Sequence, residues 1–110
     1  VIQAIQETLQ QLARFRTQGA QQQQLRERIA QGDPLAKDEC LRMWKALQPE
    51  INTYNKRLDR LPDEIGMHAR PAGQLLETCL GCGIPIDGKT YCGQLDAFER
   101  DAAQAFKKLY

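Results

Sequence analysis

The chemistry that this sequence offers is concentrated in four cysteines. Cys79, Cys82 and Cys92 lie close together in the segment CLGCGIPIDGKTYC, and Cys40 is far away in the chain. A Cys-x-x-Cys followed by glycine resembles a zinc knuckle, a turn that directs two thiolates at one metal ion. Cys92 is followed by Gly-Gln-Leu and not by a second Cys-x-x-Cys. A four-ligand zinc site would therefore need Cys40 or His68, the single histidine, as its fourth ligand.

Two disulfides are the alternative use of these residues, and we favour them. Four cysteines allow three pairings. A Cys82–Cys92 bond would close the loop between them, and a Cys40–Cys79 bond would tie the end of a third helix to the first half of the chain. Each bond would stabilise the fold by about 2–4 kcal/mol. Free buried thiols are the third alternative. Oxidised cysteines predict a secreted or periplasmic protein, whereas a zinc site predicts a cytoplasmic one.

The rest of the composition argues against several classes of function. The chain of 110 residues has 15 basic and 14 acidic side chains, a formal charge of +1 and no basic stripe, so we predict no direct contact with nucleic acid. Its apolar stretches are far shorter than the roughly 20 residues of a membrane span. With His68 alone and no recognisable nucleophile, no catalytic triad can be assembled. We therefore predict a protein that is not an enzyme and holds no cofactor, with zinc as the alternative.

Hydrophobic periodicity predicts two long helices. Apolar residues recur at intervals of three and four through residues 1–31, and again from Leu41 to Ile65. Between the two patterns lie a glycine suited to end a helix, an aspartate suited to cap the next one and a proline suited to its first turn, at residues 32–34. Pro49 falls inside the second pattern without shifting its phase, so we predict a kink there.

So short a turn predicts that the two helices fold back on each other as a long antiparallel hairpin with coiled-coil-like spacing. Residues 1–65 form this hairpin, with its tip at residues 32–34. The register places Trp44, the bulkiest side chain, opposite Gly19, where the first helix has no large side chain. We therefore predict these two residues as the packing anchor of the hairpin.

We predict that residues 66–110 form a small base, packed on the hairpin as part of one structural unit. Pro62 and the glycines within residues 66–73 break the helical run, after which a short third helix is expected. A cysteine-containing loop follows, and then a last helix from Gln94. The fold class is therefore all-α. Around the Asp87-Gly88 pair we also expect a minimal β-hairpin, formed by Ile84, Ile86, Thr90 and Tyr91.

Three acidic residues, Asp33, Asp38 and Glu39, cluster at the predicted tip. Their simplest role is to cap the start of the second helix, where negative charge is favourable. The functional alternative is that an exposed acidic tip on a long arm is a probe inserted into a partner.

In this order of elements, the hairpin tip DPLA at residues 33–36, the motif CLGCGIPI at residues 79–86 and the terminal helix resemble the DksA/TraR family of RNA polymerase regulators. The resemblance implies that the tip enters the secondary channel of the polymerase, with Asp33 as the tip acid. It also implies that Cys79, Cys82 and Cys92 bind zinc at the base of the hairpin.

The first hypothesis for function is a helical protein–protein interaction module, an adaptor, inhibitor or assembly subunit stapled by disulfides. A two-helix hairpin exposes the outer sides of its apolar stripe, so a protein partner or self-association would complete the burial. The alternative is a zinc-binding transcription regulator of the DksA/TraR type.

Overall fold

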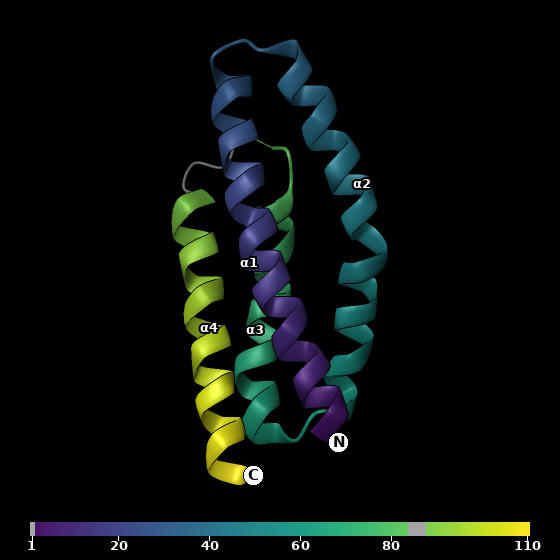
Figure 1. The fold of residues 1–110 in the computed structure, drawn as a ribbon, viewed down its shortest axis with the longest axis vertical. Helices are drawn as coiled ribbons and strands as arrows, with labels where there is room; N and C mark the ends of the chain where they lie inside the picture. Colours follow the sequence, from purple (N-terminus) through teal and green to yellow (C-terminus); the bar gives the residue numbers. More distant parts are fainter. Residues whose placement is uncertain (1, 84–87) are drawn as a thin grey trace.

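Four α-helices and one 3₁₀ turn make up the described part of the chain (Figure 1). The computed structural model describes residues 2–83 and 88–110, with the backbone alone at residues 88–91. In order, the elements are α1 (Ile2–Ala30), α2 (Pro34–Arg57), the 3₁₀ turn η1 (Leu58–Arg60), α3 (Asp63–Leu80) and α4 (Gly88–Leu109). These residues contain no β-strand, and the predicted all-α fold class is confirmed.

The turn between the first two helices has the predicted caps. Gly32 has a φ of 92°, in the left-handed region that favours glycine. Asp33 is the N-cap of α2, because its Oδ1 accepts hydrogen bonds from the backbone N–H groups of Leu35 (3.0 Å) and Ala36 (3.4 Å). Pro34 follows in the first turn, where no N–H is needed. α1 and α2 therefore run antiparallel, and their tip projects beyond α3 and α4 (Figure 1).

The second helix and the third differ from their predicted lengths. α2 continues through Pro49 but ends at Arg57, well before residue 65. Leu61 and Pro62, both with extended backbone, then precede α3, in line with the preference of a residue before proline for an extended conformation. α3 was predicted to be short and to begin after residue 73, yet it runs for 18 residues and includes Pro71 and Gly73.

Gly73 interrupts the helical pattern of the sequence but serves helix packing in the fold. A Cβ at this position would lie 2.8 Å from Asn55 Oδ1 and 3.3 Å from Tyr54 Cε1. Glycine thus allows α3 to approach α2 closely. Near this contact, the buried hydroxyl of Tyr54 donates a 2.7 Å hydrogen bond to the carbonyl oxygen of Ala69. Contacts with α2, which the spacing of apolar residues along the sequence cannot reveal, therefore keep α3 helical at Gly73.

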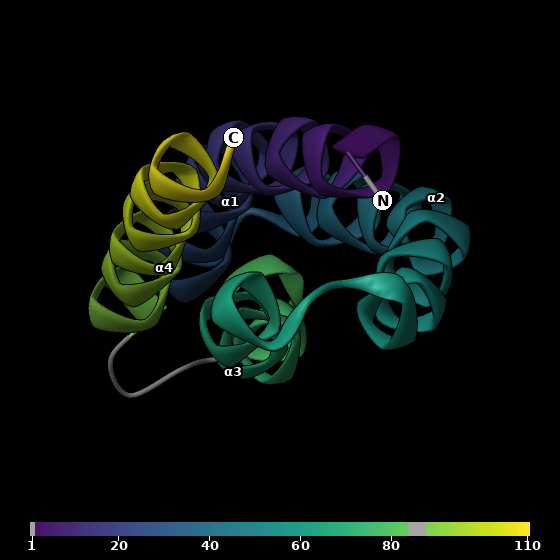
Figure 2. The same cartoon turned by 90° about the horizontal axis from the view of Figure 1, so that it is seen from below.

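One hydrophobic core joins all four helices. It includes Ile5 and Phe15 from α1, Ile51 from α2, Leu76 from α3 and Leu95 from α4. Viewed along the bundle, α1 and α3 lie between α2 on one side and α4 on the other (Figure 2). α3 and α4, the two long helices of the second half of the chain, extend alongside the hairpin (Figure 1).

α4 also takes the place of the second half of the predicted β-hairpin. The helix begins at Gly88, so Thr90 and Tyr91 are helical, and the predicted start at Gln94 is too late. Ile84 and Ile86, the other two residues of that prediction, lie outside the described residues.

The predicted packing anchor is also corrected. A Cβ built on Gly19 would lie 2.5 Å from Cys79 Sγ and 3.3 Å from Cys92 Sγ. The space beside Gly19 is therefore filled by sulfur atoms from α3 and α4 and not by Trp44. The indole of Trp44 is partly buried at the edge of the core. Leu41, predicted on the buried stripe of α2, is 40% exposed, whereas the neighbouring Cys40 is fully buried.

Candidate functional site

The four cysteines form two disulfides, Cys40–Cys82 and Cys79–Cys92, with Cα–Cα distances of 5.9 and 5.1 Å. The prediction of two disulfides is confirmed, but the predicted partners are wrong. Cys79, in the last turn of α3, is buried in the main core, where Cys92 of α4 also packs. Cys82 lies beyond the end of α3 and packs against a second cluster made by Leu25, Ala36 and Cys40 near the tip. Cys79 and Cys82, at the end of α3, therefore bond to different helices: Cys79 to α4 and Cys82 to α2.

Two buried polar side chains of α1 hold the end of α3 in this position. Gln22 is fully buried, and its Nε2 donates hydrogen bonds to the carbonyl oxygens of Leu80 (2.8 Å) and Cys40 (3.2 Å). Arg26 is 5% exposed, and its Nη1 donates to the carbonyl oxygens of Cys79 (2.8 Å) and Gly81 (2.6 Å). The bonds to Cys79, Leu80 and Gly81 satisfy carbonyl groups that the end of a helix leaves without a donor.

The charge of Arg26 is balanced by a helix end. Among the described residues no carboxylate pairs with its guanidinium. Burial lowers the pKa of Arg26, but an arginine stays protonated at any ordinary pH. The C-terminus of α3 carries the negative end of the helix dipole, which stabilises a cation placed against it. Gln22 and Arg26 therefore act as a side-chain cap on α3, delivered from a helix about 55 residues earlier in the chain.

The described residues offer no site for zinc. Within residues 2–83 and 88–110, no three side chains of the metal-ligating types come together. All four cysteine sulfurs are used in disulfides. His68, the candidate fourth ligand, lies eleven residues before Cys79 on α3, roughly 16 Å along the helix axis. The zinc knuckle predicted as the alternative is thus not supported.

Asp33, predicted as a tip acid, has a structural role. Its Oδ2 accepts hydrogen bonds from Arg28 Nη2 (2.8 Å) and Nε (3.1 Å), while its Oδ1 caps α2. The hydrogen bonds from Arg28, followed by those from the backbone, hold the pKa of Asp33 below its usual value. The interactions that tie this carboxylate to the turn leave it little capacity for a partner.

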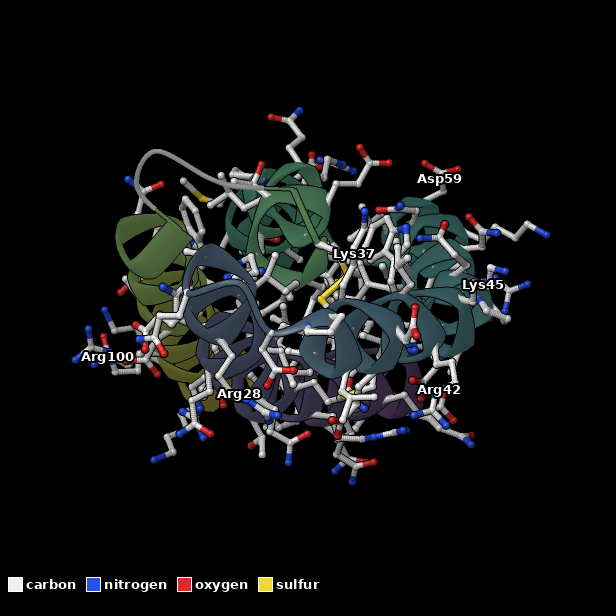
Figure 3. The ribbon with its side chains drawn as sticks, turned by 90° about the horizontal axis from the view of Figure 1, so that it is seen from above. Arg28, Lys37, Arg42, Lys45, Asp59 and Arg100 are labelled. Atoms are coloured by element: carbon white, nitrogen blue, oxygen red, sulfur yellow. A yellow bond between two sulfur atoms is a disulfide. The ribbon has the colours of Figure 1, made fainter. Side chains whose placement is uncertain are left out.

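The other two tip acids, Asp38 and Glu39, lie on a surface that sequence reasoning did not single out. They line a shallow depression along the outer side of the first half of α2, together with Leu35, Leu41, Arg42 and Lys45. We call these six residues the tip surface. Leu35 is 73% exposed and Leu41 is 40% exposed. Figure 3 shows Arg42 and Lys45 directed away from the bundle.

The tip surface is held by fixed structure at the start and at the middle of the segment that carries it. The Arg28–Asp33 pair and the N-cap order the turn before it. The Cys40–Cys82 bond, with Cys40 fully buried, joins the inner side of the same helix to the end of α3. Exposed leucines on a covalently fixed helix lose little conformational freedom when a partner covers them, which favours association.

Trp44 borders a second depression on the inner side of the tip. Its other lining residues are Ile29, Lys37, Leu41, Cys82 and Gly83. The predicted packing residue thus contributes to the edge of the core and leaves part of its indole open to the surface.

No helix in the described part of the chain is both long enough and apolar enough to cross a membrane. The resemblance to the DksA/TraR family stays a prediction. Comparisons with protein-family models, with curated proteins and with solved structures found no match to this chain.

Proposed function

We propose that this protein is a non-enzymatic interaction module whose tip surface binds a protein partner. The observation that carries the proposal is the exposure of Leu35, at 73%, on a helix that a disulfide and an N-cap hold in place. Leu41, which is 40% exposed, lies on the same depression, and neighbouring exposed apolar side chains rimmed by polar groups mark interaction sites.

The composition of the tip surface fits a protein partner better than a small molecule. Its residues come from one helix and surround an open depression with two leucines and four charged groups. Small-molecule sites are concave and enclose most of their ligand. Apolar side chains rimmed by charges are typical of protein interfaces.

The test is site-specific photo-crosslinking. Leu35 is replaced by the photoreactive residue p-benzoylphenylalanine, and the protein is irradiated both alone and in an extract of the source cells. Met67, which is 64% exposed on α3, is replaced in the matched control. We expect a discrete adduct from position 35 and none from position 67.

Competition decides whether the adduct reports a specific site. An adduct that another protein forms in the extract is expected to disappear in an excess of the unlabelled chain, but not in an excess of the Leu35→Asp variant. Equal adducts from positions 35 and 67, or an adduct with another protein that the unlabelled chain does not reduce, would refute the proposed function.

A further inference from the structure

The acidic pair and the basic pair of the tip surface lie, on average, equally far from Leu41 along α2 and on opposite sides of it. Asp38 and Glu39 precede it by three and two residues, and Arg42 and Lys45 follow it by one and four. At 1.5 Å per residue, the midpoint of the acidic pair lies about 4 Å before Leu41, and the midpoint of the basic pair lies about 4 Å after it. A half-turn about an axis through Leu41 therefore exchanges the midpoint of the acidic pair with that of the basic pair along the helix axis.

These charges have no partners within the described chain. Asp38 and Arg42 are spaced for an i,i+4 ion pair, yet neither they nor Glu39 and Lys45 pair with an opposite charge among the residues that the structure describes. By contrast, the exposed Arg16 on α1 contacts both Asp96 (2.9 Å) and Glu99 (3.0 Å) on α4. The tip surface is therefore left with opposite charges that a second molecule can neutralise.

We propose that the partner of the tip surface is a second copy of this chain, docked antiparallel along α2 about a two-fold axis near Leu41. This inference rests on the proposed function and names its partner. In such a contact Leu41 meets its own symmetry mate, and the acidic pair of each copy faces the basic pair of the other. An interface of this kind is isologous and closes at two subunits.

The size of the contact sets the expected affinity. The tip surface spans eleven residues of one helix, from Leu35 to Lys45, or roughly 15 Å. A standard interface covers about 800 Å² on each partner, more than one side of a few helical turns provides. We therefore expect a weak dimer that forms at protein concentrations of about 0.1–1 mM and becomes weaker at about 1 M salt, where exposed charges are screened.

Charge exchange tests this geometry. In one variant the acidic pair is reversed (Asp38→Lys with Glu39→Lys), and in the other the basic pair is reversed (Arg42→Glu with Lys45→Glu). Each variant alone presents four like charges, so we expect self-association, measured by sedimentation equilibrium, to weaken about tenfold or more. A 1:1 mixture restores opposite charges across the contact and is expected to form a heterodimer.

The mixture separates a lost interface from a misfolded variant, because rescue requires that both variants are folded. The matched control, Lys107→Glu with Lys108→Glu, makes the same change in charge at exposed positions of α4 and is expected to dimerise normally. A wild-type chain that stays monomeric at about 1 mM, or a mixture that stays monomeric while the wild type dimerises, overturns the two-fold contact.

The crosslinking experiment distinguishes this inference from the proposed function. An adduct of twice the chain mass from purified protein supports both. An adduct that forms in extract alone and has another mass overturns the self-association and leaves the proposed function standing. The absence of any adduct specific to position 35 refutes both.

Discussion

Replacement of Gly19 by alanine tests how closely α1 approaches the Cys79–Cys92 disulfide. The new Cβ would lie 2.5 Å from Cys79 Sγ and 3.3 Å from Cys92 Sγ. Ordinary contact would require the nearer sulfur to move by about 1 Å. Because this sulfur belongs to a disulfide that joins α3 and α4 in a dense core, it has little room to move. Overpacking of this kind costs about 1–3 kcal/mol.

A second effect of the same substitution acts in the opposite direction. Alanine is favoured over glycine inside a helix by about 1 kcal/mol, so Gly19→Ala is expected to be neutral or to destabilise the protein by up to about 2 kcal/mol. Gly93 of α4 is the matched control, since it is exposed and a Cβ there meets nothing within 4 Å. Gly93→Ala should therefore stabilise the protein by about 1 kcal/mol.

Thermal unfolding with the disulfides intact measures the difference between the two variants. One kcal/mol corresponds to about 4–8 °C in Tm for a domain near this size, so Gly19→Ala should melt at least about 4 °C below Gly93→Ala. In a background with Cys79→Ala and Cys92→Ala the sulfurs are absent, and Gly19→Ala should become stabilising. Equal Tm values for the two glycine variants in the wild-type background would show that the described contact is wrong.

Three further predictions concern the same end of the bundle. Replacing Cys40 and Cys82 by alanine should lower the free energy of unfolding by about 4 kcal/mol, and replacing Cys79 and Cys92 by about 3 kcal/mol, because the bonds close loops of 42 and 13 residues. Chemical denaturation measures both losses, and a larger loss from the shorter loop would contradict the chain-entropy argument. Arg26→Met should cost about 2–4 kcal/mol in the same assay, since two carbonyl groups of α3 lose their donor, and an unchanged midpoint would mean that solvent replaces the guanidinium. Because the pKa of Asp33 is lowered in the folded state, its carboxylate stabilises the fold above a pH of about 4, and this stabilisation is lost as the pH falls through the pKa of the folded state. Asp33→Asn, which keeps the capping oxygen, should therefore show a smaller drop in Tm between pH 4 and pH 2 than the wild type. An equal drop in the two proteins would refute this.

The parts of the fold that the sequence predicts correctly are those specified by short-range signals. The tip needs three residues with three local properties, a left-handed glycine, a capping aspartate and a proline without N–H. The helical character of α1 likewise follows from the spacing of its apolar residues along a single segment. Such features depend little on what the rest of the chain does.

The parts that the sequence does not predict depend on contacts between distant segments. Pro71 and Gly73 are helix-breaking residues by local preference, and α3 includes both because it packs against α2 and α4. The choice among three cysteine pairings likewise depends on which way the end of α3 faces. No property of Cys79 or Cys82 alone contains that information.

The capping residues on α1 are a different case, because a signal for them is present. Phe15, Gly19, Gln22 and Arg26 continue the three-and-four spacing of the buried side of α1. A polar side chain at a core position of this pattern indicates a buried group with a fixed hydrogen-bond partner. The buried position of Gln22 is nevertheless hard to recognise in the sequence, because the residue lies within a run of glutamines that is typical of a helix surface.

The Cys79-x-x-Cys82 segment also defines how the bundle would carry a mechanical load. α2 and α4 lie on opposite sides of the bundle (Figure 2), yet each is bonded to one of these two cysteines. A pull on the tip passes from Cys40 through Cys82, along the three peptide bonds between Cys82 and Cys79, and through Cys79 into Cys92 of α4. The force is thus carried by covalent bonds and not by the helix interfaces, which would otherwise slide past each other. A partner that pulls on the tip therefore loads α2, α3 and α4 together.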